Sequence, residues 1–136
     1  MIRFTFCFLL CTLPAFVGCG GGGSGGSGPQ AQVDKVTTNE LEGMKELLQQ
    51  VARSRKPIPN RLSEMQSFEP AFPELIRLLN SGECVYVWGC NIKAGSTAVL
   101  AYGKSVPDSG GPVLLQDGTV KTMSAAEFTA APKAKK

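Results

Sequence analysis

Residues 113–122 read Val-Leu-Leu-Gln-Asp-Gly-Thr-Val-Lys-Thr, which places Asp117-Gly118 between two strand-forming runs. An Asp-Gly pair in this setting predicts a β-hairpin closed by a two-residue turn with positive φ at both turn positions. Upstream, the aromatic and β-branched residues of 84–88 and 97–102 predict two more strands, and the composition of 105–111 predicts a loop. Together these segments predict an antiparallel β-meander of three to four strands.

Helices are expected on both sides of the meander. Thr37 and Glu40 form a capping-box pattern that predicts a helix from Thr38, which the sequence Lys56-Pro57 ends. Its apolar residues recur at helical spacing and form one stripe, which consists of Leu41, Met44, Leu47, Leu48 and Val51. The stripe therefore requires a partner surface, for which we expect one face of the meander.

Two shorter helices complete the expected fold. A second helix is expected at 73–80, with Pro73 in its first turn and Gly82 just past its end. A short C-terminal helix is expected after Ser124, which forms a second capping-box pattern with Glu127. Residues 61–67 fit either a helical turn or an ordered loop. The predicted fold class is α+β, with N-terminal amphipathic helices packed on a small antiparallel meander and a short helix at the C-terminal end.

The N-terminal region predicts export and lipidation. Arg3 precedes an apolar run over residues 4–17, and small Gly18 stands directly before Cys19. The pattern resembles the bacterial lipoprotein signal, which implies a signal peptide over 1–18 and a lipid on Cys19. The alternatives are an ordinary secretory signal or an uncleaved anchor. No Ala-x-Ala site is present, however, and Pro14 would break a membrane helix.

A glycine- and serine-rich segment follows Cys19 and predicts a tether over residues 19–33. A flexible chain of this length has a root-mean-square reach of about 20 Å. The segment lacks the Lys-Ser/Thr that ends a phosphate-binding loop. We expect one small domain over 34–130, followed by a basic, disordered tail over 131–136.

Composition bears on the class of function. Without Arg3 and the tail lysines, the net charge of +3 falls close to zero, so no basic footprint for nucleic acid is expected. The chain contains no histidine, which excludes Ser-His-Asp and Cys-His catalysis and imidazole-based metal ligation. Its carboxylates show no pairing pattern for acid-base catalysis. We therefore expect a protein that is not an enzyme and that requires no cofactor or metal.

Cys84 and Cys90 are the two cysteines outside the signal and the lipidation site. On a straight strand their α-carbons would lie about 20 Å apart, whereas a disulfide requires about 7 Å or less. We expect reduced, packed cysteines. A disulfide is the alternative if the chain folds back near Gly89.

The C-terminal third resembles the end of small planctomycete lipoproteins of uncharacterised function. The resemblance covers residues 99–102 and 110–124 and the pair Glu127-Phe128. The same hairpin is similar to the end of pilin-like secreted proteins of those bacteria, although a pilin keeps a long apolar N-terminal helix where this chain has a lipobox and a tether. The resemblance implies a family and not an activity.

Three classes of function follow from these features. The first is a lipid-anchored envelope protein, held on a membrane by its anchor, whose small domain contacts an envelope protein partner, with Tyr86 and Trp88 as candidate contact residues if they are not part of the core. The second is a surface-held module that binds a ligand or the cell wall, which an exposed aromatic groove would favour. The third is an accessory of a pilus-like or secretion system.

Overall fold

The computed structural model of the chain describes residues 35–136. The expected signal peptide, Cys19 and the tether lie outside the described residues. The elements in chain order are α1 (Thr38–Arg53), α2 (Leu62–Met65), η1 (Gln66–Phe68), α3 (Pro73–Ser81), β1 (Cys84–Tyr86), β2 (Val99–Gly103), α4 (Val106–Ser109), β3 (Gly111–Leu115), β4 (Val120–Met123) and α5 (Ala125–Ala130). The α+β prediction is therefore confirmed. None of the helices between residues 35 and 136 is long and apolar enough to cross a membrane.

Helix α1 begins where its capping box predicts. The Thr37 backbone N–H donates to Glu40 Oε2 at 2.9 Å. All five residues of the apolar stripe are buried, and Val36, just before the cap, is buried with them. Since this stripe packs against the sheet and against α3, the predicted partner surface of α1 is confirmed.

The four strands form one antiparallel sheet in the order β1-β2-β3-β4, which is a meander. The register shifts between Val99 and Ala101, where Leu100 is the extra residue of a β-bulge. As a result, both Leu100 and Ala101 belong to the core beneath α1.

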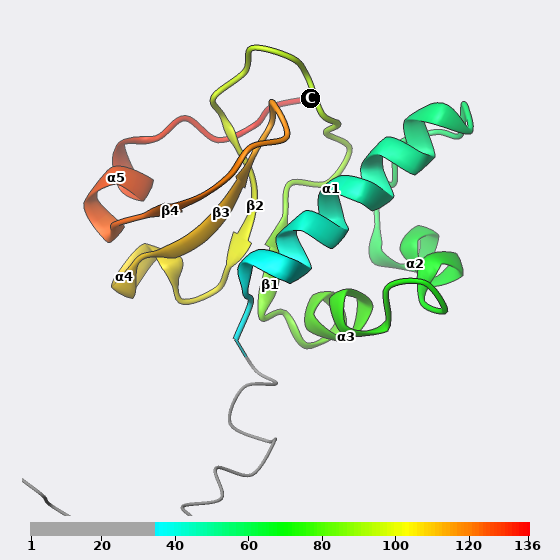
Figure 1. Cartoon of the computed structure of the whole chain (residues 1–136), viewed down its shortest axis with the longest axis horizontal. Helices are drawn as coiled ribbons and strands as arrows, with labels where there is room; N and C mark the ends of the chain where they lie inside the picture. Colours follow the sequence, from blue (N-terminus) through cyan, green and yellow to red (C-terminus); the bar gives the residue numbers. More distant parts are fainter. Residues whose placement is uncertain (1–34) are drawn as a thin grey trace, which may run out of the picture.

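Each face of the sheet carries its own core. The larger core lies between the sheet and helices α1 and α3. The second core is built on the opposite face, where α4 and α5 cover the sheet (Figure 1), and its buried residues are Val99, Val106, Val113, Leu115, Met123 and Phe128. The uninterrupted apolar runs of β2 and β3 agree with burial on both faces.

The hairpin between β3 and β4 differs from its prediction. Leu115 N–H donates to Thr119 O at 2.8 Å and Gly118 N–H donates to Leu115 O at 3.0 Å, so the loop has three residues. Gly118 has a φ of 89°, whereas Asp117 is not among the residues with positive φ. The two-residue primed turn is wrong because Gln116 belongs to the loop, where it bonds to the 93–98 segment. This loop is a turn followed by a left-handed glycine.

Residues 105–111 were expected as a loop and instead contain helix α4. Ser109 N–H donates to Ser105 O at 2.9 Å, and Val106 is anchored in the second core. Pro107 lies in the first turn of this helix, and Gly110, with a φ of 71°, ends it. The residues that indicated a loop therefore mark the two ends of a short helix.

The predicted disordered tail is wrong for residues 132–134. Val99 N–H donates to Pro132 O at 2.8 Å, and Ala134 N–H donates to Val99 O at 2.9 Å, which forms a parallel bridge between Val99 and Lys133. Ala134 is buried. The tail pairs with main-chain groups at the start of β2, which β1 does not reach. It pairs there because buried main-chain groups require hydrogen-bond partners.

Candidate binding surface along helix α1

The two candidate cysteines are both buried and both free. The strand expected over 84–88 ends at Tyr86, and the chain turns back near Gly89, which has a φ of 77°. Burial, followed by the charge of Glu40, raises the pKa of the Cys84 thiol to about 12. A thiol with so high a pKa is a poor nucleophile at neutral pH, so Cys84 has the character of a packing residue.

Tyr86 and Trp88 do not form an exposed aromatic face. The two rings meet edge to face with their centroids 5.0 Å apart. Tyr86 is buried and its hydroxyl donates to Cys90 O, while Trp88 is half-buried against the larger core. Burial and then Cys90 raise the pKa of the Tyr86 phenol. These aromatics belong to the core, which was the other interpretation of the sequence.

Two hollows lie along one face of α1 and share Phe72 as a lining residue. One hollow has a volume of about 430 Å³ and the other about 160 Å³, and Phe72 lines both. The α1 residues that line them are mostly separated by intervals of three and so share one face of the helix. They are Asn39, Glu40, Gly43, Glu46, Gln49, Gln50 and Arg53. We call this region the α1 groove.

Phe72 approaches α1 at a glycine. A methyl group placed at Gly43 would lie 3.4 Å from Phe72 Cδ1, which is van der Waals contact, so the Phe72 ring packs over Gly43. Glycine in a helix interior is unfavourable by about 0.5–1 kcal/mol relative to alanine. Gly43 was therefore the signal in the sequence for a close approach, and the sequence interpretation missed both it and Phe72.

The α1 groove combines an aromatic ring with amide and charged side chains. Glu40 accepts a hydrogen bond from the Thr37 backbone N–H. Glu74 lies at the α3 end of the groove and accepts from Arg77 Nε at 3.0 Å. Gln49 and Gln50 can both donate and accept hydrogen bonds. Such a lining is suited to holding a polar ligand that has an apolar face.

A third hollow, of about 150 Å³, lies beyond the end of α1. Lys56 Nζ lies 5.8 Å from the centroid of the Phe68 ring, and Pro57, Pro59 and Glu64 also line this hollow. The hydrogen bond from the Asn60 backbone N–H is the main cause that lowers the pKa of Glu64, and the bond from Arg61 adds to it. The Glu64 carboxylate is therefore charged at neutral pH.

Within residues 35–136, His, Cys, Asp and Glu side chains nowhere gather in a group of three that could hold a metal ion. Cys19, the expected lipidation site, is outside that range. Comparison of the chain with protein-family models, with curated proteins and with solved structures finds no match.

Proposed function

We propose that this chain is a lipid-anchored protein of the bacterial cell envelope whose small domain acts by binding a partner and not by catalysis. The observation that carries the proposal is Cys19, which follows an apolar run and Gly18 and precedes a glycine-rich tether. A lipid on Cys19 would hold the domain at a membrane surface, since each buried methylene contributes roughly 0.8 kcal/mol.

The position of the domain ends is compatible with this arrangement. The described domain begins at Lys35, directly before α1, and its C-terminus lies on the opposite side (Figure 1). A tether attached at Lys35 would therefore leave the C-terminal side and the end of α1 facing away from the membrane. Contacts with other envelope components would be made from that side and from the length of α1.

Replacement of Cys19 tests the anchor. We would express the full chain with a tag after Lys136, which is exposed, in a bacterium with lipoprotein export. Wild type, Cys19→Ala and the matched control Cys11→Ala would be compared by radiolabelled palmitate incorporation and membrane fractionation. We expect label and membrane retention in wild type and in Cys11→Ala but not in Cys19→Ala. Absence of label in wild type would refute the anchor.

A second candidate function is a ligand-binding or cell-wall-binding module, which the α1 groove favours. Retention of the protein on purified peptidoglycan is the measurement. The double variant Glu46→Ala/Gln50→Ala removes two groove side chains, and Glu69→Ala/Gln66→Ala removes the same two residue types at exposed positions outside the groove. Loss of retention in the first variant alone is expected, and equal retention of both variants would remove this candidate.

A further inference from the structure

Two distant parts of the chain bring basic residues to the side of the domain opposite Lys35. The end of α1 and the residues directly after it supply Arg53, Arg55 and Lys56, and the C-terminus supplies Lys135 and Lys136; all five are exposed. Figure 1 shows the end of α1 and the C-terminus on the same side of the molecule. We call this group the basic end.

The C-terminal lysine lies on the segment that follows α1. A Cβ atom placed at Gly89 would clash with Lys136 Cε and would lie 2.6 Å from Asn60 Oδ1. The side chains of Lys136 and Asn60 therefore both lie directly over Gly89. Gly89 N–H donates to Pro59 O at 3.1 Å. The pairing of residues 132–134 with β2 holds the tail in this place, so the lysines belong to the folded surface.

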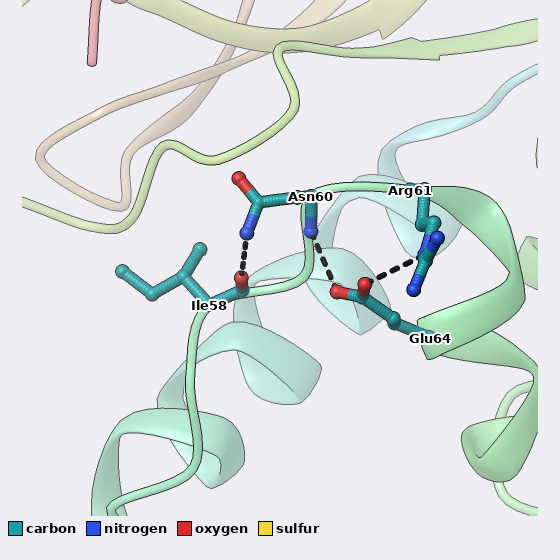
Figure 2. A network of polar contacts seen from close by, with 4 residues as sticks. All are labelled: Ile58, Asn60, Arg61 and Glu64. Carbon is teal, nitrogen blue, oxygen red and sulfur yellow. Dashed lines mark hydrogen bonds and ion pairs between the residues drawn. The ribbon is translucent and has the colours of Figure 1, made fainter.

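Polar contacts fix the shape of the segment between α1 and α2. Figure 2 shows Asn60 N–H donating to Glu64 Oε2 at 2.9 Å, Asn60 Nδ2 donating to Ile58 O at 3.1 Å, and Arg61 Nε donating to Glu64 Oε1 at 2.8 Å. Arg61 is thereby neutralised by Glu64. The five residues of the basic end, in contrast, have no ion-pair partner among the described residues.

Arg55 stands where the backbone favours glycine. Arg55 N–H donates to Ala52 O and Lys56 N–H donates to Val51 O, which is the Schellman motif, and Arg55 has a φ of 53°. Arginine in this left-handed conformation is strained, and strained backbone positions cluster at functional sites. Arg55 therefore stands between Arg53 and Lys56 directly after α1, and all three residues are exposed.

We infer that the basic end binds an anionic polymer of the cell envelope, whose acidic groups repeat along its chain. The inference rests on the proposed function, since it names the class of partner that the anchored domain would contact. Unpaired, exposed charges of one sign attract such a polymer, and arginine forks match phosphate and carboxylate oxygens in pairs. The basic end faces away from Lys35, which favours a polymer beyond the anchoring membrane over the lipids of that membrane.

The test uses the purified full chain with Cys19→Ala in every protein compared, so that no lipid anchor contributes to binding, and the protein with no further change serves as wild type. Three probes are used: beads coated with polyphosphate, beads coated with poly-L-glutamate, and vesicles of phosphatidylglycerol and phosphatidylethanolamine. The variant Arg53→Gln/Arg55→Gly/Lys56→Gln removes three charges from the basic end. The control Lys35→Gln/Lys104→Gln/Lys121→Gln removes three charges from exposed positions elsewhere. Circular dichroism melting of each variant verifies that it is folded.

Wild type is expected to bind at least one polymer in a salt-sensitive manner, and the better polymer identifies the acidic group. The basic-end variant should bind about 100-fold more weakly, at roughly fivefold per charge, and the control should bind nearly as wild type. Equal weakening of both variants, no binding of wild type to either polymer, or stronger binding to vesicles would overturn the inference. The labelling of Cys19 tests the anchor in cells, whereas this experiment measures polymer binding by purified protein. Failure of the anchor and failure of the inference can therefore be told apart.

Discussion

Arg55 has a backbone conformation that is unfavourable for a residue with a Cβ atom. It is the only non-glycine residue with positive φ in the described part of the chain. Arg55→Gly should raise the free energy of unfolding by about 0.5–1 kcal/mol, because the relief of left-handed strain exceeds the entropy that glycine gains in the unfolded chain. Urea denaturation followed by circular dichroism is the measurement.

Ser54→Gly is the control for Arg55→Gly. Ser54 is the neighbouring residue and has an ordinary right-handed conformation, with a φ of −77°. Glycine there should lower stability slightly, since no strain is relieved. If both substitutions changed the free energy of unfolding in the same direction, the strain at Arg55 would not be real.

Single residues also explain which parts of the candidate surface could be predicted. The apolar stripe of α1 follows from helical spacing alone, so its burial was predictable. The position of Phe72 was not predictable, because it depends on Gly43 lying opposite the ring. The basic end was not predictable either, because it depends on a tail that pairs with Val99. Contacts between residues so distant in sequence are set by the fold and leave no local pattern.

The C-terminal end of helix α5 is stabilised by Lys133. The Lys133 ammonium donates to Phe128 O at 2.6 Å and to Ala131 O at 2.9 Å. Its Nζ lies 3.9 Å from the centroid of the Phe128 ring. Lys133→Ala should therefore lower the free energy of unfolding by about 1–2 kcal/mol. Lys135→Ala, an exposed neighbour, should leave it unchanged. Thermal melting that gave equal values for both variants would contradict this role.

The capping box at the start of α5 gives stability a pH dependence. Ser124 N–H donates to Glu127 Oε2 at 2.7 Å, and this backbone bond, followed by the Ser124 hydroxyl, lowers the pKa of Glu127 below its ordinary 4.5. A carboxyl group with a lowered folded-state pKa stabilises the fold above its unfolded-state pKa and loses that contribution as pH falls through the folded-state value. The contribution of the Glu127 charge should therefore be full at pH 7.

Glu127→Gln tests this dependence, because the amide keeps the shape of the cap but carries no charge. Wild type should be more stable than the variant at pH 7, and the difference should shrink as pH falls below about 4.5. Urea denaturation of both proteins across that range measures it. A difference that stayed constant with pH would mean that the charge of Glu127 has no part in the cap.

Most elements were predictable because their ends carry chemical signals. The capping boxes at Thr37 and Ser124 and the left-handed Gly82 were all correctly placed. The hairpin was predicted at the right residues but with the wrong turn, because the bonds of Gln116 to the 93–98 segment are tertiary contacts. Helix α4 was missed because proline and glycine indicate an end of a helix as well as a loop.

At the scale of the whole molecule, one sheet joins two cores of different size. The larger core depends on α1, whose buried stripe supplies five of its side chains. The smaller core is formed by the C-terminal third of the chain, from Val99 onward. Since β2 and β3 contribute to both cores, loss of the α1 contact should unfold the entire domain in one transition.

Leu48→Asp tests this dependence, because Leu48 has no exposed surface and lies in the larger core. An aspartate there would bury an unpaired charge and lose the apolar contact, at more than about 4 kcal/mol, which is close to the total stability of a small domain. The variant should therefore show no cooperative melting by circular dichroism. Gln50→Asp places the same residue on the exposed side of α1 and should melt cooperatively, as should Lys135→Ala. Cooperative melting of Leu48→Asp near the wild-type temperature would show that α1 is dispensable to the fold.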